Sequence, residues 1–110
     1  MGFETTDPMS WAKFAIEALH RGENVQIRPR GHSMKGRVND GDLVTVQQCN
    51  PEDLRVGDIV LVRVRGRDYL HLVKAVNQRR FLIGNNRGGI NGWVGVNSVY
   101  GIATRVAPGN

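Results

Sequence analysis

Cysteine, aromatic residues and long apolar runs are all scarce in the 110-residue sequence. The single cysteine, Cys49, permits no internal disulfide bond and has no partner at zinc-ligand spacing among the three histidines. No apolar run approaches the roughly 18–20 residues of a membrane span, and the N-terminus lacks the basic-then-apolar pattern of a secretion signal. We therefore expect a cytoplasmic chain that folds by packing alone, with no metal, no other cofactor and no membrane partner.

Lysine is the next scarce residue, because twelve of the fifteen basic side chains are arginine. Fifteen basic residues against ten acidic ones give a net charge of +5. This balance favours anionic surfaces but is too diffuse to indicate nucleic-acid binding by itself. The three lysines, by contrast, are specific choices, and one of them lies in an apolar segment.

Valine and glycine are abundant, and their pattern predicts a mostly β protein. An apolar helical stripe that includes Met9, Ala12 and Phe14 predicts one helix over 9–21, with Asp7 as its N-cap and Gly22 at its end. Residues 1–23 thus form an N-terminal helix. We expect residues 24–108 to form a β domain, and the helix and this β part to make up a single domain overall.

Period-two patterns place strands from residue 25, in GDLVTV at 41–46, in GDIVLV at 57–62, in FLIG at 81–84 and over about 99–106. Asp42 and Asp58 read as turn-capping carboxylates at strand starts. Hairpin turns are expected at 65–68 and 77–80, and NNRGGINGW at 85–93 is predicted to be a loop. The fold class is a small coiled antiparallel sheet or partly open barrel with one N-terminal helix.

The stretch RGHSMKG at 30–36 places Ser33 in a turn that could expose its hydroxyl. Serine beside glycine is also an ordinary turn former, so the local pattern leaves both interpretations open. A serine nucleophile needs a base, which arginine cannot supply and a desolvated lysine can. Lys74 lies in HLVKAV and shares a strand face with Leu72 and Val76. Facing inward it is a candidate base, and facing outward it only discourages strand aggregation.

Taken together, GHSMKGRVNDGDLVTV, VGDIVLVRV, LVKAV and LIGNN resemble the serine–lysine peptidase clan of LexA-type repressors, UmuD-type proteins and bacterial signal peptidases, the S24/S26-like peptidases. The similarity covers about residues 25–106, with 41 positions from Ser33 to Lys74. It implies a LexA/signal-peptidase-like β fold and a serine endopeptidase that acts on a protein or peptide substrate.

The resemblance also implies roles for individual residues. Ser33 would be the nucleophile and Lys74 the general base, with the oxyanion held by the backbone N–H of Ser33 and helped by that of His32. Met34 would form a wall of the cleft, and the substrate would lie extended beside a strand edge. Relatives of this group often pair through their last strands, which makes a homodimer one of the expected states.

Two departures narrow the expected activity. The chain has no membrane segment and shows Lys35-Gly36 after Met34, which argues against signal-peptide removal. The 32 residues before Ser33 contain no Ala-Gly or Cys-Gly pair and only one expected helix, which is too little for a helix-turn-helix. Self-cleavage of the repressor type is therefore not expected.

The sequence leaves two alternatives to a serine–lysine peptidase. A Ser-His-Asp triad is disfavoured because His71 is an odd number of strand positions from Lys74, so the two side chains should face opposite ways. The second alternative is a catalytically silent binding module on the same fold. Its outer face of Arg63, Arg65 and Arg67 would contact an acidic partner or nucleic acid, although it lacks the aromatics that stack on bases.

Overall fold

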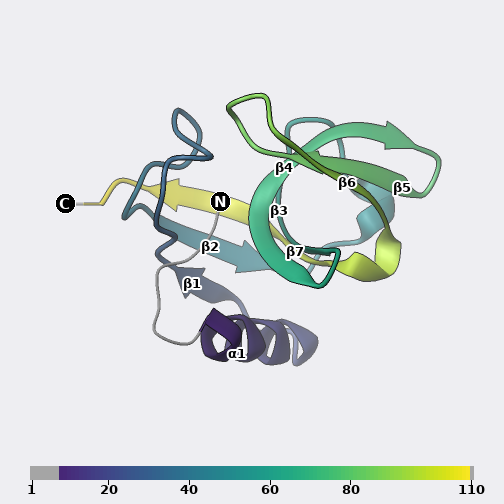
Figure 1. Ribbon diagram of the computed structural model, residues 1–110. Coiled ribbons are helices and arrows are strands. Elements are labelled where there is room, and N and C mark those ends of the chain that lie inside the picture. The colour runs from purple at the N-terminus through teal and green to yellow at the C-terminus, as the bar shows by residue number, and fades with distance from the viewer. Residues whose placement is uncertain (1–7, 110) are drawn as a thin grey trace.

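The computed structural model describes residues 8–109, which form an α-helix and a seven-stranded antiparallel sheet (Figure 1). The sheet order is β1-β2-β7-β3-β4-β5-β6, and β1 and β6 are its two ends, so the sheet is not closed. The predicted coiled, partly open antiparallel fold with one N-terminal helix is confirmed. The elements are α1 (Pro8–His20), β1 (Val25–Ile27), β2 (Leu43–Gln47), the 3-10 turn η1 (Pro51–Asp53), β3 (Ile59–Val64), β4 (Arg67–Asn77), β5 (Arg80–Gly84), β6 (Ile90–Gly95), the 3-10 turn η2 (Val96–Ser98) and β7 (Val99–Ala107).

Strand β7 joins the two parts of the molecule. One half of β7 pairs with β2 and the other half with β3, and each pairing contains a register shift. Such irregularities increase the local twist and bend of a sheet. In Figure 1, β3 to β6 curve into a ring, whereas β1 and β2 extend to one side above α1. Strand β6 also contacts β3, so the ring comes close to closing.

The coiling gives the sheet two hydrophobic cores. Strand β3 runs between them: Ile59 and Leu61 pack into one core, and Val60 and Val62 pack into the other. The first core lies toward α1, β2 and the segment after β1, and the second lies within the ring. This explains why β3 is buried on both faces and carries a nearly continuous run of aliphatic residues.

Helix α1 covers the first core with its small-residue face. Ala15 and Leu19 are buried there, and the helix contacts β1 and β7. Phe14, which we expected in the apolar stripe, is 71% exposed. The side chains of Met9 and Ala12, also predicted for that stripe, lie outside the described residues.

The end of α1 is a Schellman motif. The Glu23 N–H donates to the Ala18 carbonyl over 3.0 Å and the Gly22 N–H to the Leu19 carbonyl over 2.9 Å. Gly22 has a φ of +80°, a conformation that glycine adopts at no steric cost. The predicted C-terminal stop is therefore confirmed, whereas the predicted cap Asp7 lies outside the described residues.

The hairpin between β3 and β4 turns at Arg65-Gly66, within the predicted segment. Positive φ values of 51° and 80° at these two positions fit a two-residue type I′ turn. Arg65 is therefore a turn residue, while Arg63 lies on β3 and Arg67 starts β4. The expectation that these three arginines alternate along one outer strand face is wrong for this reason.

The segment predicted as a loop at 85–93 is partly a strand. Strand β6 begins at Ile90 and pairs Trp93 with Leu82 and Val94 with Phe81 of β5. Asparagine and glycine in GGINGW favoured a loop in isolation. Main-chain pairing with β5 and burial of Val94 in the ring override that preference.

Two aspartates act as the predicted caps. Asp42 accepts hydrogen bonds from the backbone N–H of Asn39 and Gly109, and Asp58 accepts one from the Arg55 N–H. Within residues 8–109 we find no helix of the length and apolarity needed to cross a bilayer. The same part of the chain holds no group of three or more metal-ligating side chains.

Candidate active site

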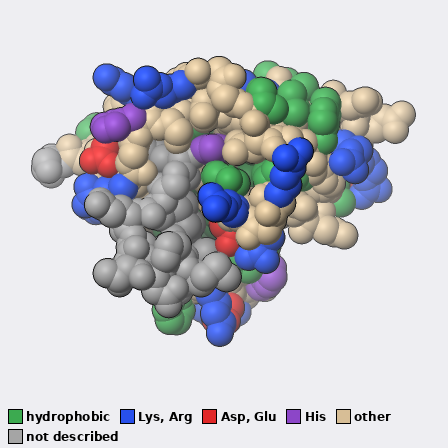
Figure 2. Space-filling view, viewed as in Figure 1, with side chains coloured by type: hydrophobic (Ala, Val, Ile, Leu, Met, Phe, Trp, Pro, Cys, Tyr) green, Lys and Arg blue, Asp and Glu red, His purple; other side chains and the backbone are tan. Residues whose placement is uncertain are grey.

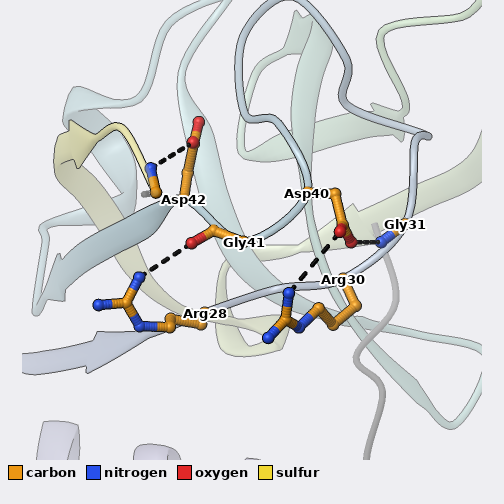
Figure 3. A network of polar contacts seen from close by, with 7 residues as sticks. Arg28, Arg30, Gly31, Asp40, Gly41 and Asp42 are labelled. Carbon is orange, nitrogen blue, oxygen red and sulfur yellow. Dashed lines mark hydrogen bonds and ion pairs between the residues drawn. The ribbon is translucent and has the colours of Figure 1, made fainter.

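The loop that carries Ser33 runs from β1 to β2 and is braced at its base (Figure 3). The Gly31 N–H donates to Asp40 Oδ1 over 2.7 Å, and Arg30 Nη1 lies 3.7 Å from the other carboxylate oxygen of Asp40. Arg28 donates to the Gly41 carbonyl over 3.0 Å. These contacts hold the two ends of the loop together at its base.

The tip of the loop is a helical turn anchored in the first core. The Lys35 N–H bonds the His32 carbonyl over 3.1 Å, and the Val38 N–H bonds the Met34 carbonyl over 2.8 Å. Met34 and Val38 have no exposed surface, whereas Ser33 is half-buried and His32 is exposed. The buried Met34 thus anchors the turn and leaves the neighbouring serine near the surface.

The serine loop docks on the loop between β5 and β6. The Asn86 N–H donates to the Ser33 carbonyl over 2.8 Å, and Asn86 Nδ2 donates to the Lys35 carbonyl over 2.8 Å. The Asn85 side chain accepts from the N–H groups of Arg87 and Gly89 at 2.9 and 2.8 Å, which fixes the second loop. Two loops distant in sequence therefore hold the serine between them.

The Ser33 hydroxyl contacts a histidine. Ser33 Oγ lies 3.4 Å from Nε2 of His71 on β4, and His71 Nδ1 lies 2.7 Å from Oδ1 of Asn91 on β6. The serine–histidine contact is long for a hydrogen bond, as is common before substrate is bound. Contacts in this order are those that a nucleophile, its base and an orienting group make in known enzymes.

The tautomer of His71 follows from its partners. Because Asn91 Oδ1 can only accept, Nδ1 carries the proton and Nε2 presents its lone pair to Ser33. Burial lowers the pKa of His71 below its ordinary value, and the hydrogen bond to Asn91 acts in the opposite direction. The lowered pKa favours the neutral form of His71, the form that a general base requires.

Tyr69 completes the setting of this histidine. Its ring stacks on that of His71 with centroids 4.8 Å apart and an interplanar angle of 28°. With a hydrogen bond at one nitrogen and a ring against its face, the imidazole has little freedom to rotate.

Lys74 lies at a β-bulge. The register of β4 on β5 passes from Val73↔Ile83 to Ala75↔Leu82, so Lys74 is the extra residue. Its Nζ donates to the Asn85 carbonyl over 2.9 Å. Among the described residues the hydrogen bond of the Lys74 amine goes to Asn85, and no hydrogen bond joins Lys74 to Ser33.

The Lys74 side chain passes over Gly84, where the sequence reads LIGNN. A Cβ at Gly84 would meet the Gly89 carbonyl oxygen and lie 3.1 Å from Lys74 Cγ and from Ile90 Cδ1. Only glycine leaves this space free. The bulge and this close approach let Lys74 turn toward the loop that holds Ser33.

The backbone near Ser33 offers donors for an oxyanion. Within residues 8–109, the N–H of Ser33 has no hydrogen-bond acceptor, and neither has that of Met34. Free N–H groups beside a nucleophile are the elements of an oxyanion hole. The predicted use of the Ser33 N–H is compatible with this geometry.

A model of the Peptidase S24-like family matches residues 6–89, more than half of the chain. The chain belongs to the Peptidase S24-like family. Among curated proteins no match was found. In this S24-like domain the matched segment includes Ser33, His71 and Lys74 and ends before Asn91.

The three arginines of the predicted anionic-partner face do not form one surface in this S24-like domain. Arg63 forms a two-bond ion pair with Asp68 and lies 6.0 Å from the centre of the Tyr100 ring. It lines a hollow beside α1, whereas Arg65 and Arg67 line another hollow near β6. On the face drawn in Figure 2 the basic side chains lie in separate groups, not in a continuous stripe.

Sequence reasoning missed His71 and Asn91 as members of the site. Strict alternation along the strand predicts that His71 and Lys74 face opposite ways, and the bulge at Lys74 breaks that alternation. Asn91 lay in a segment expected to be a loop. The histidine itself is the available signal, because it is a polar ring between Leu70 and Leu72 in the strand.

Proposed function

We propose that this S24-like domain is a serine endopeptidase in which Ser33 is the nucleophile and His71 the general base. The contact between Ser33 Oγ and His71 Nε2 carries the proposal. Asn91 acts as a positioning residue, because it accepts the Nδ1–H bond that keeps Nε2 unprotonated. Membership of a peptidase family supports a hydrolytic role for Ser33, and burial that lowers the pKa of His71 supports the histidine as its base.

The first half of the reaction forms an acyl-enzyme. His71 Nε2 takes the proton of the Ser33 hydroxyl as Oγ attacks the carbonyl carbon of the scissile bond. The negative charge moves to the carbonyl oxygen, where the free N–H of Ser33 stabilises it. When the tetrahedral intermediate collapses, the C–N bond breaks and the imidazolium returns its proton to the leaving amine.

The second half repeats these steps with water. His71 takes a proton from a water molecule, the hydroxide attacks the Ser33 ester, and the serine leaves with the proton from the imidazolium. Asn91 remains the acceptor for Nδ1–H in both halves. A neutral amide stabilises the transient imidazolium less than a carboxylate would, so we expect a slow peptidase compared with triad enzymes.

The substrate has an edge along which to bind. Strand β6 is an end strand of the sheet, and it carries Asn91 of the site. An extended peptide can add to such an edge through main-chain hydrogen bonds. This arrangement would bring the scissile bond past Ser33.

Lys74 is the second candidate for the base, through the resemblance to serine–lysine peptidases. Its amine binds the Asn85 carbonyl, one residue before Asn86, which binds the Ser33 carbonyl. In the observed geometry Lys74 supports the loop that holds the serine. We therefore assign it a positioning role and test it against His71.

A proteome-derived peptide library tests the proposal. Purified protein is incubated with the library and new termini are quantified by mass spectrometry, in parallel for Ser33→Ala, His71→Gln, Lys74→Met and the exposed-site control Arg105→Gln. We expect no cleavage by Ser33→Ala and a loss of about 10²–10⁴-fold for His71→Gln, the usual contribution of a general base. Lys74→Met should keep more activity than His71→Gln, and Arg105→Gln should match the wild type.

Other outcomes identify which part is wrong. Cleavage that survives Ser33→Ala rules out Ser33 as nucleophile. Full activity in His71→Gln with none in Lys74→Met makes Lys74 the base. If the folded wild type cuts nothing yet binds polyanions in a salt-dependent manner, the domain is a binding module. Circular dichroism of each variant separates loss of activity from loss of fold.

A further inference from the structure

A hollow beside the proposed catalytic histidine is lined by two arginines whose charge has no role in the proposed reaction. Its volume is about 320 Å³, and it lies between the β3–β4 turn, β4 and the start of β6. Tyr69 and Asn91 form part of its wall, and both contact His71 directly. Two of the residues that line the hollow therefore touch the ring of the proposed base.

Two arginines stand at this hollow without an acidic partner. Arg65 and Arg67 are exposed, and neither forms an ion pair within the described part of the chain. The nearby Asp68 is occupied, because it binds Arg63 through both carboxylate oxygens at 2.9 and 3.0 Å. The local charge is thus positive and uncompensated.

The head of Arg65 lies close to β6. A Cβ at Gly92 of β6 would lie 3.9 Å from Nε and Nη2 of Arg65 and 3.6 Å from Val64 Cγ1. The remaining walls come from the apolar side chains of Val64 and Ile90 and from the Tyr69 ring. A guanidinium above an apolar wall suits a short aliphatic stem that ends in a carboxylate.

We propose that this hollow is a substrate subsite that selects an acidic side chain, glutamate above all, close to the scissile bond. The inference rests on the proposed peptidase function, because the substrate chain must pass β6 and His71 for its side chain to enter the hollow. Arg65 and Arg67 bind the carboxylate, and Val64, Tyr69 and Ile90 contact the methylene groups. Glutamine fits the same space without the charge, which makes it the matched comparison.

A binding measurement tests the subsite apart from cleavage. Fluorescein-labelled ten-residue peptides with both ends blocked carry one glutamate stepped through an alanine background, with glutamine peptides as controls. Fluorescence anisotropy with the full-length Ser33→Ala variant gives Kd for each peptide. We expect one glutamate position to bind about five- to tenfold more tightly than its glutamine counterpart, a preference that weakens with added salt.

Protein variants locate the effect. Arg65→Gln combined with Arg67→Gln should abolish the preference for glutamate and leave the glutamine peptides unchanged, whereas Arg105→Gln, an exposed arginine on β7, should keep it. Arg65→Glu with Arg67→Glu should favour lysine at the same position. An unblocked alanine peptide measures whether a terminal carboxylate competes. Tighter binding of that peptide than of any glutamate peptide would overturn the assignment to a side chain.

The two proposals fail differently. Equal binding and equal cleavage of glutamate and glutamine peptides would overturn the subsite while the peptidase function stands. A glutamate preference that depends on Arg65 and Arg67 in a protein that cuts no peptide would keep the subsite and remove the peptidase. In protein that retains Ser33, we expect the arginine substitutions to raise KM for glutamate peptides and to leave kcat nearly unchanged.

Discussion

The hydrogen bond between His71 and Asn91 gives the sharpest prediction about the site. Replacing Asn91 by leucine removes the only described acceptor for the buried Nδ1–H of His71, at 2.7 Å. A buried donor without a partner costs about 1–3 kcal/mol. If that energy holds the productive tautomer, kcat/KM should fall by about 5- to 150-fold, since 1.36 kcal/mol corresponds to a factor of ten. The fall should be smaller than that of His71→Gln, which removes the whole contribution of a general base, about 10²–10⁴-fold.

Replacing Asn91 by aspartate separates positioning from packing. The carboxylate keeps an oxygen acceptor and adds a negative charge, which favours the imidazolium and raises the pKa of His71. In the wild type burial lowers that pKa, so the acid limb of kcat/KM should lie below about pH 6.5. In Asn91→Asp the limb should move to higher pH while activity at pH 8 is retained.

The assay is the pH dependence of kcat/KM on one peptide identified from the library, between pH 4.5 and 9. Asn97→Asp, which adds the same charge at an exposed asparagine on η2, is the matched control and should leave the limb in place. An unchanged limb in Asn91→Asp, or full activity in Asn91→Leu, would refute the assignment of Asn91 to His71.

Three further predictions concern the scaffold. Gly84→Ala should destabilise the protein by about 1–3 kcal/mol in urea unfolding, because its Cβ meets the Gly89 carbonyl oxygen. Gly95→Ala, whose Cβ meets no atom within 4 Å, should be nearly neutral, and equal effects of the two substitutions would contradict the close approach at Gly84. Met34→Ala should cost about 2–5 kcal/mol, whereas Phe14→Ala at an exposed site should cost less than about 0.5; a small effect at Met34 would show that the serine turn is not anchored in the core. Because the folded-state pKa of His71 is lowered, its contribution to stability is present above about pH 6.5 and is lost as the pH falls through the folded-state value. The wild type should therefore lose more stability between pH 7 and pH 5 than His71→Gln. An equal loss in the two proteins would contradict a buried neutral His71.

The sequence was sufficient for the parts of the fold that depend on local chemistry. Valine-rich runs after Gly-Asp turns predicted β2 and β3, and Gly22 predicted the end of α1. Strand β6 was missed because its stability comes from pairing with β5 and not from its own residues, which include Asn91 and Gly92. The topology that inserts β7 between β2 and β3 is likewise a long-range property.

The candidate site could be predicted only in part, because its contacts also depend on long-range packing. Ser33 is marked by its own turn, and its neighbourhood identified the family. Its contact with His71 depends on where two loops dock, through Asn86, and the orientation of Lys74 depends on a bulge. A bulge adds one residue to a strand without a local sequence requirement, so a period-two pattern cannot show which side chains share a face beyond it.

The central claim is that His71 activates Ser33. A fluorophosphonate probe reacts with activated serine hydroxyls, and intact and peptide mass spectrometry locate the adduct. We predict labelling at Ser33 in the wild type and in Lys74→Met, with labelling lost in His71→Gln and Ser33→Ala. Labelling of Ser33 that is unchanged in His71→Gln and lost in Lys74→Met would contradict it.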